Sequence, residues 1–164
     1  MGGGYHGGFG NTFGSAVAGD ASFMGSTEQF LRNIRNRKDV DPGGKFDIIA
    51  HGTASSMQVE HNGKKIQIDS RTAAKLIKKL PGYHGQSIRL LSCSTGASSV
   101  GFAQNLANKL GVTVYAPSDK LWAYGNGKHI VAATSSVPDM YGNPQPDLTR
   151  KGKFVKYVPG GNKR

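Results

Sequence analysis

The sequence contains one cysteine, few acidic residues and no long apolar run. A single cysteine, Cys93, excludes an internal disulfide and any zinc site built from several cysteines. No hydrophobic run approaches the roughly 20 residues that a membrane-spanning helix needs. The first six residues fit neither a secretory signal peptide nor a myristoylation signal, since His6 stands where that signal has Ser or Thr. We therefore expect a soluble, single-domain protein with one thiol.

Positive charge dominates the sequence of 164 residues. Lysine and arginine number 21 against 10 aspartates and glutamates, which gives a formal net charge of +11. The basic residues are spread along the chain without interleaved aromatic residues, so they indicate either a solvated basic surface or attraction to a polyanion. No metal site is predicted, because the sequence lacks HNH-type and paired-carboxylate motifs, and the remaining histidines have no ligand spacing: His6, His61, His84 and His129.

Glycine is concentrated at the start of the chain. Nine of the first 25 residues are glycine, and no helical or strand period runs through this stretch. Ordering a glycine-rich segment costs much backbone entropy. The sequence therefore predicts a flexible leader over residues 1–25 and one folded domain over residues 26–164.

Within the predicted domain, apolar patterns and turn signals alternate between strands and helices. We expect helices over 26–34, 70–80 and 102–110, central strands over 46–50, 87–93 and 112–116, hairpins over 57–68 and 120–133, and a last strand over 154–158. Residues 134–149, with three prolines, are predicted to be a loop. Strands alternating with helices favour an α/β fold, namely a three-layer α/β/α sandwich with a mostly parallel sheet and added β-hairpins.

Two residues with chemical potential follow predicted central strands. His51 comes after the first strand and Cys93 after the second, and the carboxyl ends of parallel strands are where sites form. A thiol becomes an effective nucleophile beside an imidazole or a helix N-terminus, which the helix beginning near 98–101 would supply. The backbone N–H groups of Gly52 and Cys93 would then face one oxyanion. The structural alternative is that Cys93 is simply a small buried core residue.

The segments FDIIAHG and IRLLSCSTG together resemble the paired signature of caspase-like cysteine peptidases. This group includes caspases, legumains, gingipains, separases and the self-processing domains of bacterial toxins, and the tail also resembles modules of polymorphic toxins. The resemblance covers about residues 45–133. It implies that Cys93 is the nucleophile, that His51 is the catalytic base, and that Gly52 and Cys93 form the oxyanion hole.

The resemblance also implies substrate-binding residues. Leu91, two residues before the nucleophile, corresponds to a position that lines the S1 pocket and favours a small or aliphatic side chain. Trp122 is a candidate wall of the substrate groove. Both residues have a structural alternative as core residues. Asp20 is a candidate third catalytic residue, although a Cys–His dyad is also found in this group.

The chemistry implied by the resemblance needs no cofactor. The toxin peptidases are activated by inositol hexakisphosphate, and a lysine cluster for it is expected among Lys64, Lys65, Lys120, Lys128, Lys153 and Lys156. The expected partners are a protein or peptide substrate, the parent polypeptide itself and an immunity protein, rather than a membrane or nucleic acid. A bacterium would secrete or inject the domain, which would act in the reducing cytosol of a recipient cell.

Two alternative functions remain open from the residues alone. The same Cys–His pair is suited to deamidation or acyl transfer on a host protein, because these reactions share the covalent step with proteolysis. Alternatively, the chain is a non-enzymatic, basic module that binds nucleic acid and keeps Cys93 in its core.

Overall fold

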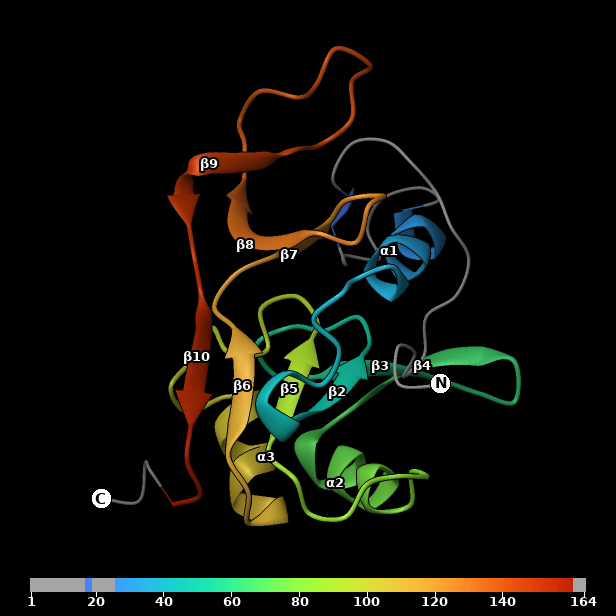
Figure 1. The fold of residues 1–164 in the computed structure, drawn as a ribbon, viewed down its shortest axis with the longest axis vertical. Coiled ribbons are helices and arrows are strands. Elements are labelled where there is room, and N and C mark those ends of the chain that lie inside the picture. The colour runs from blue at the N-terminus through green and yellow to red at the C-terminus, as the bar shows by residue number, and fades with distance from the viewer. Residues whose placement is uncertain (1–16, 19–25, 161–164) are drawn as a thin grey trace.

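The computed structural model describes residues 17–18 and 26–160. Within them the chain forms three α-helices, ten β-strands and one short 3-10 helix, η1 (Pro42–Gly44). The strands are arranged as two four-stranded sheets and one two-stranded hairpin. Figure 1 shows the central sheet in the lower half of the view and the second four-stranded sheet above it. The protein is therefore a mixed α/β structure, as the sequence predicts.

The central sheet has the strand order β10-β6-β5-β2. β2 (Phe46–Ile49) pairs in parallel with β5 (Ile88–Leu91), and β5 pairs in parallel with β6 (Val114–Pro117). β10 (Phe154–Tyr157) joins β6 as an antiparallel edge strand. The three strands of the predicted core thus form the parallel part of a mixed sheet, and β2 is its other edge.

Two helices pack with one face of this sheet. α2 (Ser70–Lys78) and α3 (Phe102–Leu110) contribute buried residues to a cluster that includes Ile48 of β2 and Leu90 of β5. α2 begins where predicted, because the Asp69 carboxylate accepts a hydrogen bond of 2.9 Å from the Thr72 N–H. α3 ends at Gly111, whose φ of 72° suits glycine.

The other face of β2 and β5 packs against α1 (Ser26–Arg35). Phe30 and Ile34 of this helix are fully buried in a second cluster with Ile49 and Leu91. Because strand side chains alternate, odd-numbered residues of β2 and β5 lie on this face and even-numbered ones on the face of α2 and α3. This parity places the candidate site on the side of α1.

The second sheet contains β1 (Val17–Ala18), β7 (Leu121–Ala123), β8 (His129–Thr134) and β9 (Pro146–Lys151). β1 pairs with β7, so these two residues do not belong to a leader; the remainder of 1–25 lies outside the described residues. β9 replaces part of the loop predicted over 134–149. Four of its six residues are polar and most are exposed, and main-chain bonds to β8 define it, so it carries no hydrophobic period.

The hairpin of β3 (Met57–His61) and β4 (Lys64–Ile68) lies beside the end of β2, where Gly52 forms a bridge with Met57. Its turn is the predicted Asn62-Gly63 pair, with φ of 51° and 78°. Positive φ at both positions is typical of the tight hairpin turn that Asn-Gly favours. In the described part of the chain no helix is long and apolar enough to cross a membrane.

Candidate active site

His51 and Cys93 occupy matching positions on neighbouring parallel strands. Ile49 pairs with Leu91 in the register of β2 and β5, and each candidate lies two residues beyond the end of its strand. The Ala50 N–H donates to the Leu91 carbonyl oxygen at 3.2 Å, which extends the pairing toward the site. The expectation that the two residues share one edge of the sheet is confirmed.

Both side chains belong to the face that packs against α1. The His51 ring lies 6.0 Å, centroid to centroid, from the ring of Phe30, and Cys93 belongs to the same apolar cluster as Phe30. The exposed fraction is 7% for His51 and 2% for Cys93. The imidazole and the thiol therefore enter one largely dry environment from two adjacent strands.

Gly52 allows the loop after His51 to lie against the loop after Cys93. A Cβ atom at Gly52 would lie 2.6 Å from Cγ2 of Thr95 and 3.1 Å from the carbonyl oxygen of Cys93. The loop is held by hydrogen bonds of 2.9 Å from Gln58 N–H to His51 and from Thr53 N–H to Ser56. Neither bond uses the Gly52 N–H, the predicted oxyanion donor.

The Cys93 thiol is covered by β7. The Leu121 N–H donates to Sγ at 3.3 Å, and the thiol donates to the Leu121 carbonyl oxygen at 3.9 Å. Directly after Cys93 the chain turns sharply, with Ser94 at φ 60° and its N–H bonded to the Asp119 carbonyl oxygen at 3.0 Å. A substrate carbonyl can therefore reach the sulfur only when the β7 main chain moves aside.

The expected aid from the N-terminus of α3 is not found. The N–H of Phe102 donates to the carbonyl oxygen of Ala54 at 2.9 Å, and that of Ala103 donates to Thr95 at 3.1 Å. These first amides are thus bonded to loop carbonyl groups and not to the sulfur, although the bond to Thr95 places the helix N-terminus near the end of β5, as expected. The sequence shows a helix start but not which acceptors fold over it.

The two substrate-binding assignments are corrected by burial. Leu91 is fully buried in the cluster beneath α1, and Trp122 is fully buried with its indole N–H donating to the Ala132 carbonyl oxygen at 2.9 Å. Neither side chain lines an open groove. Both are core residues, which was the alternative to a substrate-binding role, since each belongs to a strand enclosed by neighbouring elements.

A pocket of about 640 Å³ lies on the outer side of β2. Its lining combines His51 and Ile49 with aliphatic side chains of the hairpin and of α2, among them Met57, Leu76 and Leu80. Cys93 does not line it. Of the two proposed catalytic side chains, His51 is therefore the one that borders this pocket.

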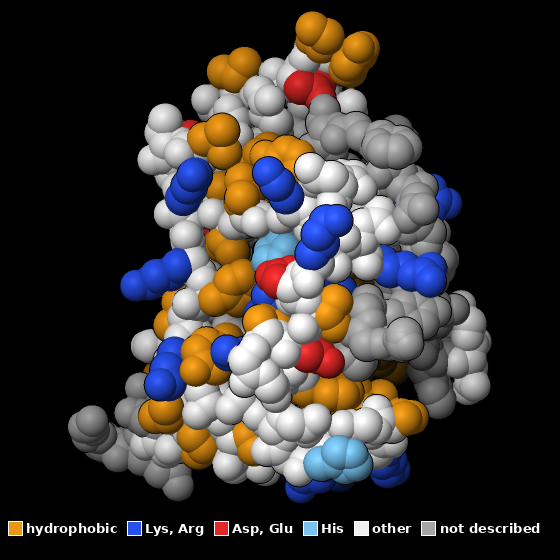
Figure 2. Space-filling view, in the orientation of Figure 1, with side chains coloured by type: hydrophobic (Ala, Val, Ile, Leu, Met, Phe, Trp, Pro, Cys, Tyr) orange, Lys and Arg blue, Asp and Glu red, His pale blue; other side chains and the backbone are white. Residues whose placement is uncertain are grey.

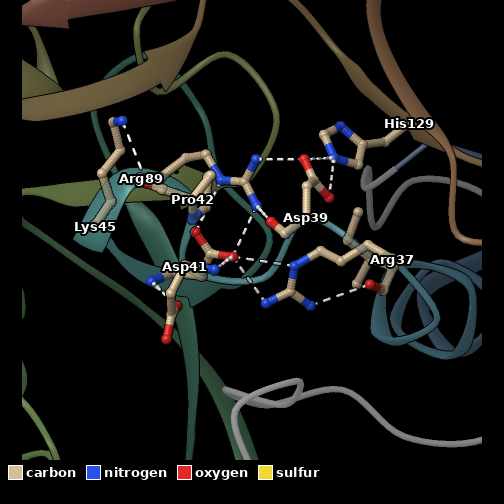
Figure 3. A network of polar contacts seen from close by, with 9 residues as sticks. Arg37, Asp39, Asp41, Pro42, Lys45, Arg89 and His129 are labelled. Atoms are coloured by element: carbon tan, nitrogen blue, oxygen red, sulfur yellow. Dashed lines mark hydrogen bonds and ion pairs between the residues drawn. The ribbon is translucent and has the colours of Figure 1, made fainter.

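A buried charge network lies on the same face of the sheet as His51 and Cys93, four residues earlier in β2 and in β5 (Figure 3). Asp47 of β2 is fully buried and accepts hydrogen bonds from Arg37 at 2.9 Å and from Arg89 of β5 at 2.7 Å. Arg89 also donates to Asp39 at 2.8 Å, and Asp39 contacts Nε2 of His129 in β8 at 3.0 Å. This network was not predicted from the sequence. Its signal was the charged residue within each apolar strand, Asp47 in FDII and Arg89 in IRLL.

The network shifts the protonation of its members. Burial raises the pKa of Asp39, but the hydrogen bond from Arg89 and the charges of His129 and Arg89 outweigh it and hold the pKa below its usual value. Burial lowers the pKa of His129, although the Asp39 carboxylate acts against that change. For Arg89 the carboxylates of Asp47 and Asp39 overcome burial and raise the pKa. These directions favour a charged Arg–Asp core and make the imidazole of His129 harder to protonate than a free one.

Other predicted groupings are not formed. β10, with Lys153 just before it, and the β3–β4 hairpin lie on opposite sides in Figure 1, so the six lysines expected around inositol hexakisphosphate do not gather at one place. Figure 2 likewise shows Lys and Arg side chains scattered over the visible face. Over 17–18 and 26–160 no group of three or more His, Cys, Asp or Glu side chains is placed to hold a metal ion. Asp20 lies outside the described residues.

Comparison with known proteins relates the chain to one family. The model of a family described as a domain of unknown function (DUF8616) matches residues 19–131, which is more than half of the chain. No curated protein and no solved structure matches significantly. The matched region contains His51, Gly52 and Cys93 and ends within β8. The protein therefore belongs to the DUF8616 family.

Proposed function

We propose that the protein is a cysteine peptidase of the caspase-like type, with Cys93 as nucleophile and His51 as general base. The observation that carries this proposal is the matched register of the two residues at the carboxyl edge of β2 and β5. Helix α1 on one face and α2 with α3 on the other support the finer assignment of a three-layer α/β/α arrangement, in which residues of β7 and β8 share the cluster of α1.

The proposed reaction is acyl transfer through a thioester. His51 removes the thiol proton, Sγ bonds to the substrate carbonyl carbon, and the Gly52 and Cys93 N–H groups stabilise the oxyanion. The C–N bond then breaks as the imidazolium gives its proton to the leaving amine. Water, deprotonated by His51, attacks the thioester, and the protonated thiol leaves.

The described structure corresponds to a resting state of this proposed enzyme. The sulfur is 2% exposed and bonded to Leu121, so the reaction requires β7 to separate from Cys93 before a substrate enters. Separation costs the contacts between Cys93 and Leu121, about 1 kcal/mol each, and exposure of the fully buried Leu121 side chain costs about 1.5–3 kcal/mol, so substrate binding has to supply this free energy. The proposal therefore includes an opening step at β7.

Cleavage of a mixed peptide library, followed by mass spectrometry, tests the proposal. We expect Cys93→Ala and His51→Ala each to lower the cleavage rate by about 10³-fold or more. His84→Ala, which changes an exposed histidine, is the matched control and should keep the parent rate. Equal cleavage by Cys93→Ala and the parent would overturn the proposal, and a +1 Da shift of an intact peptide would indicate deamidation instead.

Burial of the thiol specifically favours a second candidate, a non-enzymatic basic module. Cys93 lies in an apolar cluster, and the net charge of +11 attracts polyanions. Alkylation of the folded protein by iodoacetamide separates the candidates. The peptidase should be alkylated much faster than it unfolds, because β7 opens. A thiol modified only at the rate of global unfolding, with salt-dependent binding to nucleic acid, would favour the module.

A further inference from the structure

We propose that the pocket on the outer side of β2 binds an extended peptide segment that carries aliphatic and acidic side chains. The peptide would add to the edge of β2 and run past His51. The role of this segment as substrate rests on the proposed peptidase function, whereas the binding itself does not. The strand edge, the apolar walls and the charges of the pocket each fit such a segment.

The edge of β2 presents main-chain groups to the pocket. The Ala50 N–H points inward, since it donates to Leu91 of β5. Hydrogen-bonding directions alternate along a strand, so the N–H and C=O of Ile49 point outward, and Ile49 lines the pocket. The next outward-facing main-chain groups before and after Ile49 are already hydrogen-bonded. The Asp47 N–H donates to the Asp41 carboxylate, and the His51 carbonyl oxygen accepts from the Gln58 N–H. An added peptide would thus pair with Ile49 through two main-chain hydrogen bonds.

The walls of the pocket expose apolar side chains on the helix opposite this edge. Leu76 and Leu80, four residues apart along one side of α2 and just beyond it, are 42% and 39% exposed, and both line the pocket. Met57 and Val59 of the hairpin complete an aliphatic surface on the opposite side. Contiguous exposed apolar surface of this kind marks a binding site. Every second side chain of an added strand would point into it.

The charges around the pocket have one sign. Lys65 of the hairpin and Lys79 at the end of α2 line it, and among its described lining residues there is no aspartate or glutamate. The net charge of +11 extends this preference beyond the pocket. Acidic residues that alternate with aliphatic ones are therefore the complementary ligand. The choice of a peptide, rather than a fatty acid, comes from the outward main-chain groups of Ile49.

Binding is measured by fluorescence anisotropy with the Cys93→Ala variant, so that no cleavage intervenes. The probe is a labelled eight-residue peptide of alternating Leu and Glu, compared with its Leu–Lys counterpart and with a form N-methylated along its backbone. We expect the acidic peptide to bind at least tenfold more tightly than either comparison peptide. Equal binding of all three would overturn the proposal.

Variants of the pocket locate the binding. Combined Leu76→Asp and Leu80→Asp should weaken it at least tenfold, while Val100→Asp, at an apolar residue that is 69% exposed elsewhere, should not. Lys79→Glu should weaken it several-fold, whereas Lys75→Glu on the same helix but outside the lining should not. Unfolding temperatures confirm that each variant is folded. Unchanged binding in the pocket variants, displacement by a fatty acid alone, or self-association that occupies the site would each overturn the proposal.

The two proposals fail in different ways. If the acidic peptide binds through Leu76 and Leu80 but the parent protein does not cleave it, the docking site is supported and the peptidase assignment fails. If the parent cleaves peptides and the Leu76→Asp, Leu80→Asp double variant cleaves them with an unchanged KM, the peptidase assignment holds and the docking site fails.

Discussion

Gly52 links the two halves of the candidate site through its lack of a side chain. The resemblance gave it an oxyanion role, while the structure adds a packing reason: its Cα approaches Thr95 and the Cys93 carbonyl too closely for a Cβ atom. Its neighbours His51 and Cys93 depend on that approach, because each lies in one of the two loops that meet here. The absence of a side chain at Gly52 thus allows the loop after His51 to lie close to the loop after Cys93.

We expect Gly52→Ala to lower the free energy of unfolding by about 1–3 kcal/mol, since the added methyl group overpacks a close contact. Urea denaturation measures this change. Combining it with Thr95→Ser removes the nearest obstructing atom, Cγ2, and should restore part of the stability. An alanine variant as stable as the parent, or a double variant less stable than the sum of its two changes, would contradict this explanation.

At the scale of elements, a hydrogen bond between two side chains joins the loop before β2 to strand β8. Asp39 lies between α1 and β2, and its carboxylate contacts His129 at the start of β8. Burial is the largest influence on His129 and lowers its pKa from the usual value of 6.5. The folded protein therefore holds this imidazole neutral more strongly than the unfolded chain does.

This pKa direction sets the pH dependence. Because the unfolded chain binds the proton more readily, the stabilising effect is fully present above pH 6.5 and is lost as the pH falls below it toward the lower folded pKa. We expect the unfolding temperature to fall between pH 7.5 and 5. His129→Gln should make this decline shallower, with His84→Gln as the exposed control. An equally steep decline in His129→Gln would show that other groups are responsible.

The elements that sequence analysis found have strong local signals. The apolar period of α1, the cap of Asp69 and the Asn62-Gly63 turn each act within a few residues, so they are readable without the fold. β1 and β9 have no such signal. They exist because an edge of β7 and of β8 accepts their main-chain groups, and that edge is created only by folding.

At the scale of the whole molecule, one carboxylate connects several elements. Asp47 of β2 binds Arg37, which follows α1, and Arg89 of β5, and Arg89 continues through Asp39 to β8. Each arginine is therefore neutralised in the interior, so a share of the few acidic residues is used internally. Two arginines and two aspartates thus offset each other within the network, and the net charge of +11 is carried by the remaining residues.

We expect Asp47→Asn to lower the free energy of unfolding by about 3–5 kcal/mol, since it leaves two buried guanidinium groups without their shared carboxylate. Asp69→Asn is the control, because asparagine caps a helix as well as aspartate does and the side chain is exposed. Chemical denaturation compares the two. If both variants match the parent, the network does not stabilise the fold.

The sequence by itself determined the α/β class, the central strands and helices, and the shared sheet edge of His51 and Cys93, because hydrophobic periods and strand ends are local properties. Tertiary structure alone decided that β7 covers the thiol, that Leu91 and Trp122 are interior, and that two arginines meet at Asp47. These outcomes depend on which distant segments pack over a residue. Local sequence carries little information on that packing, since many segments of similar polarity compete for the same surface.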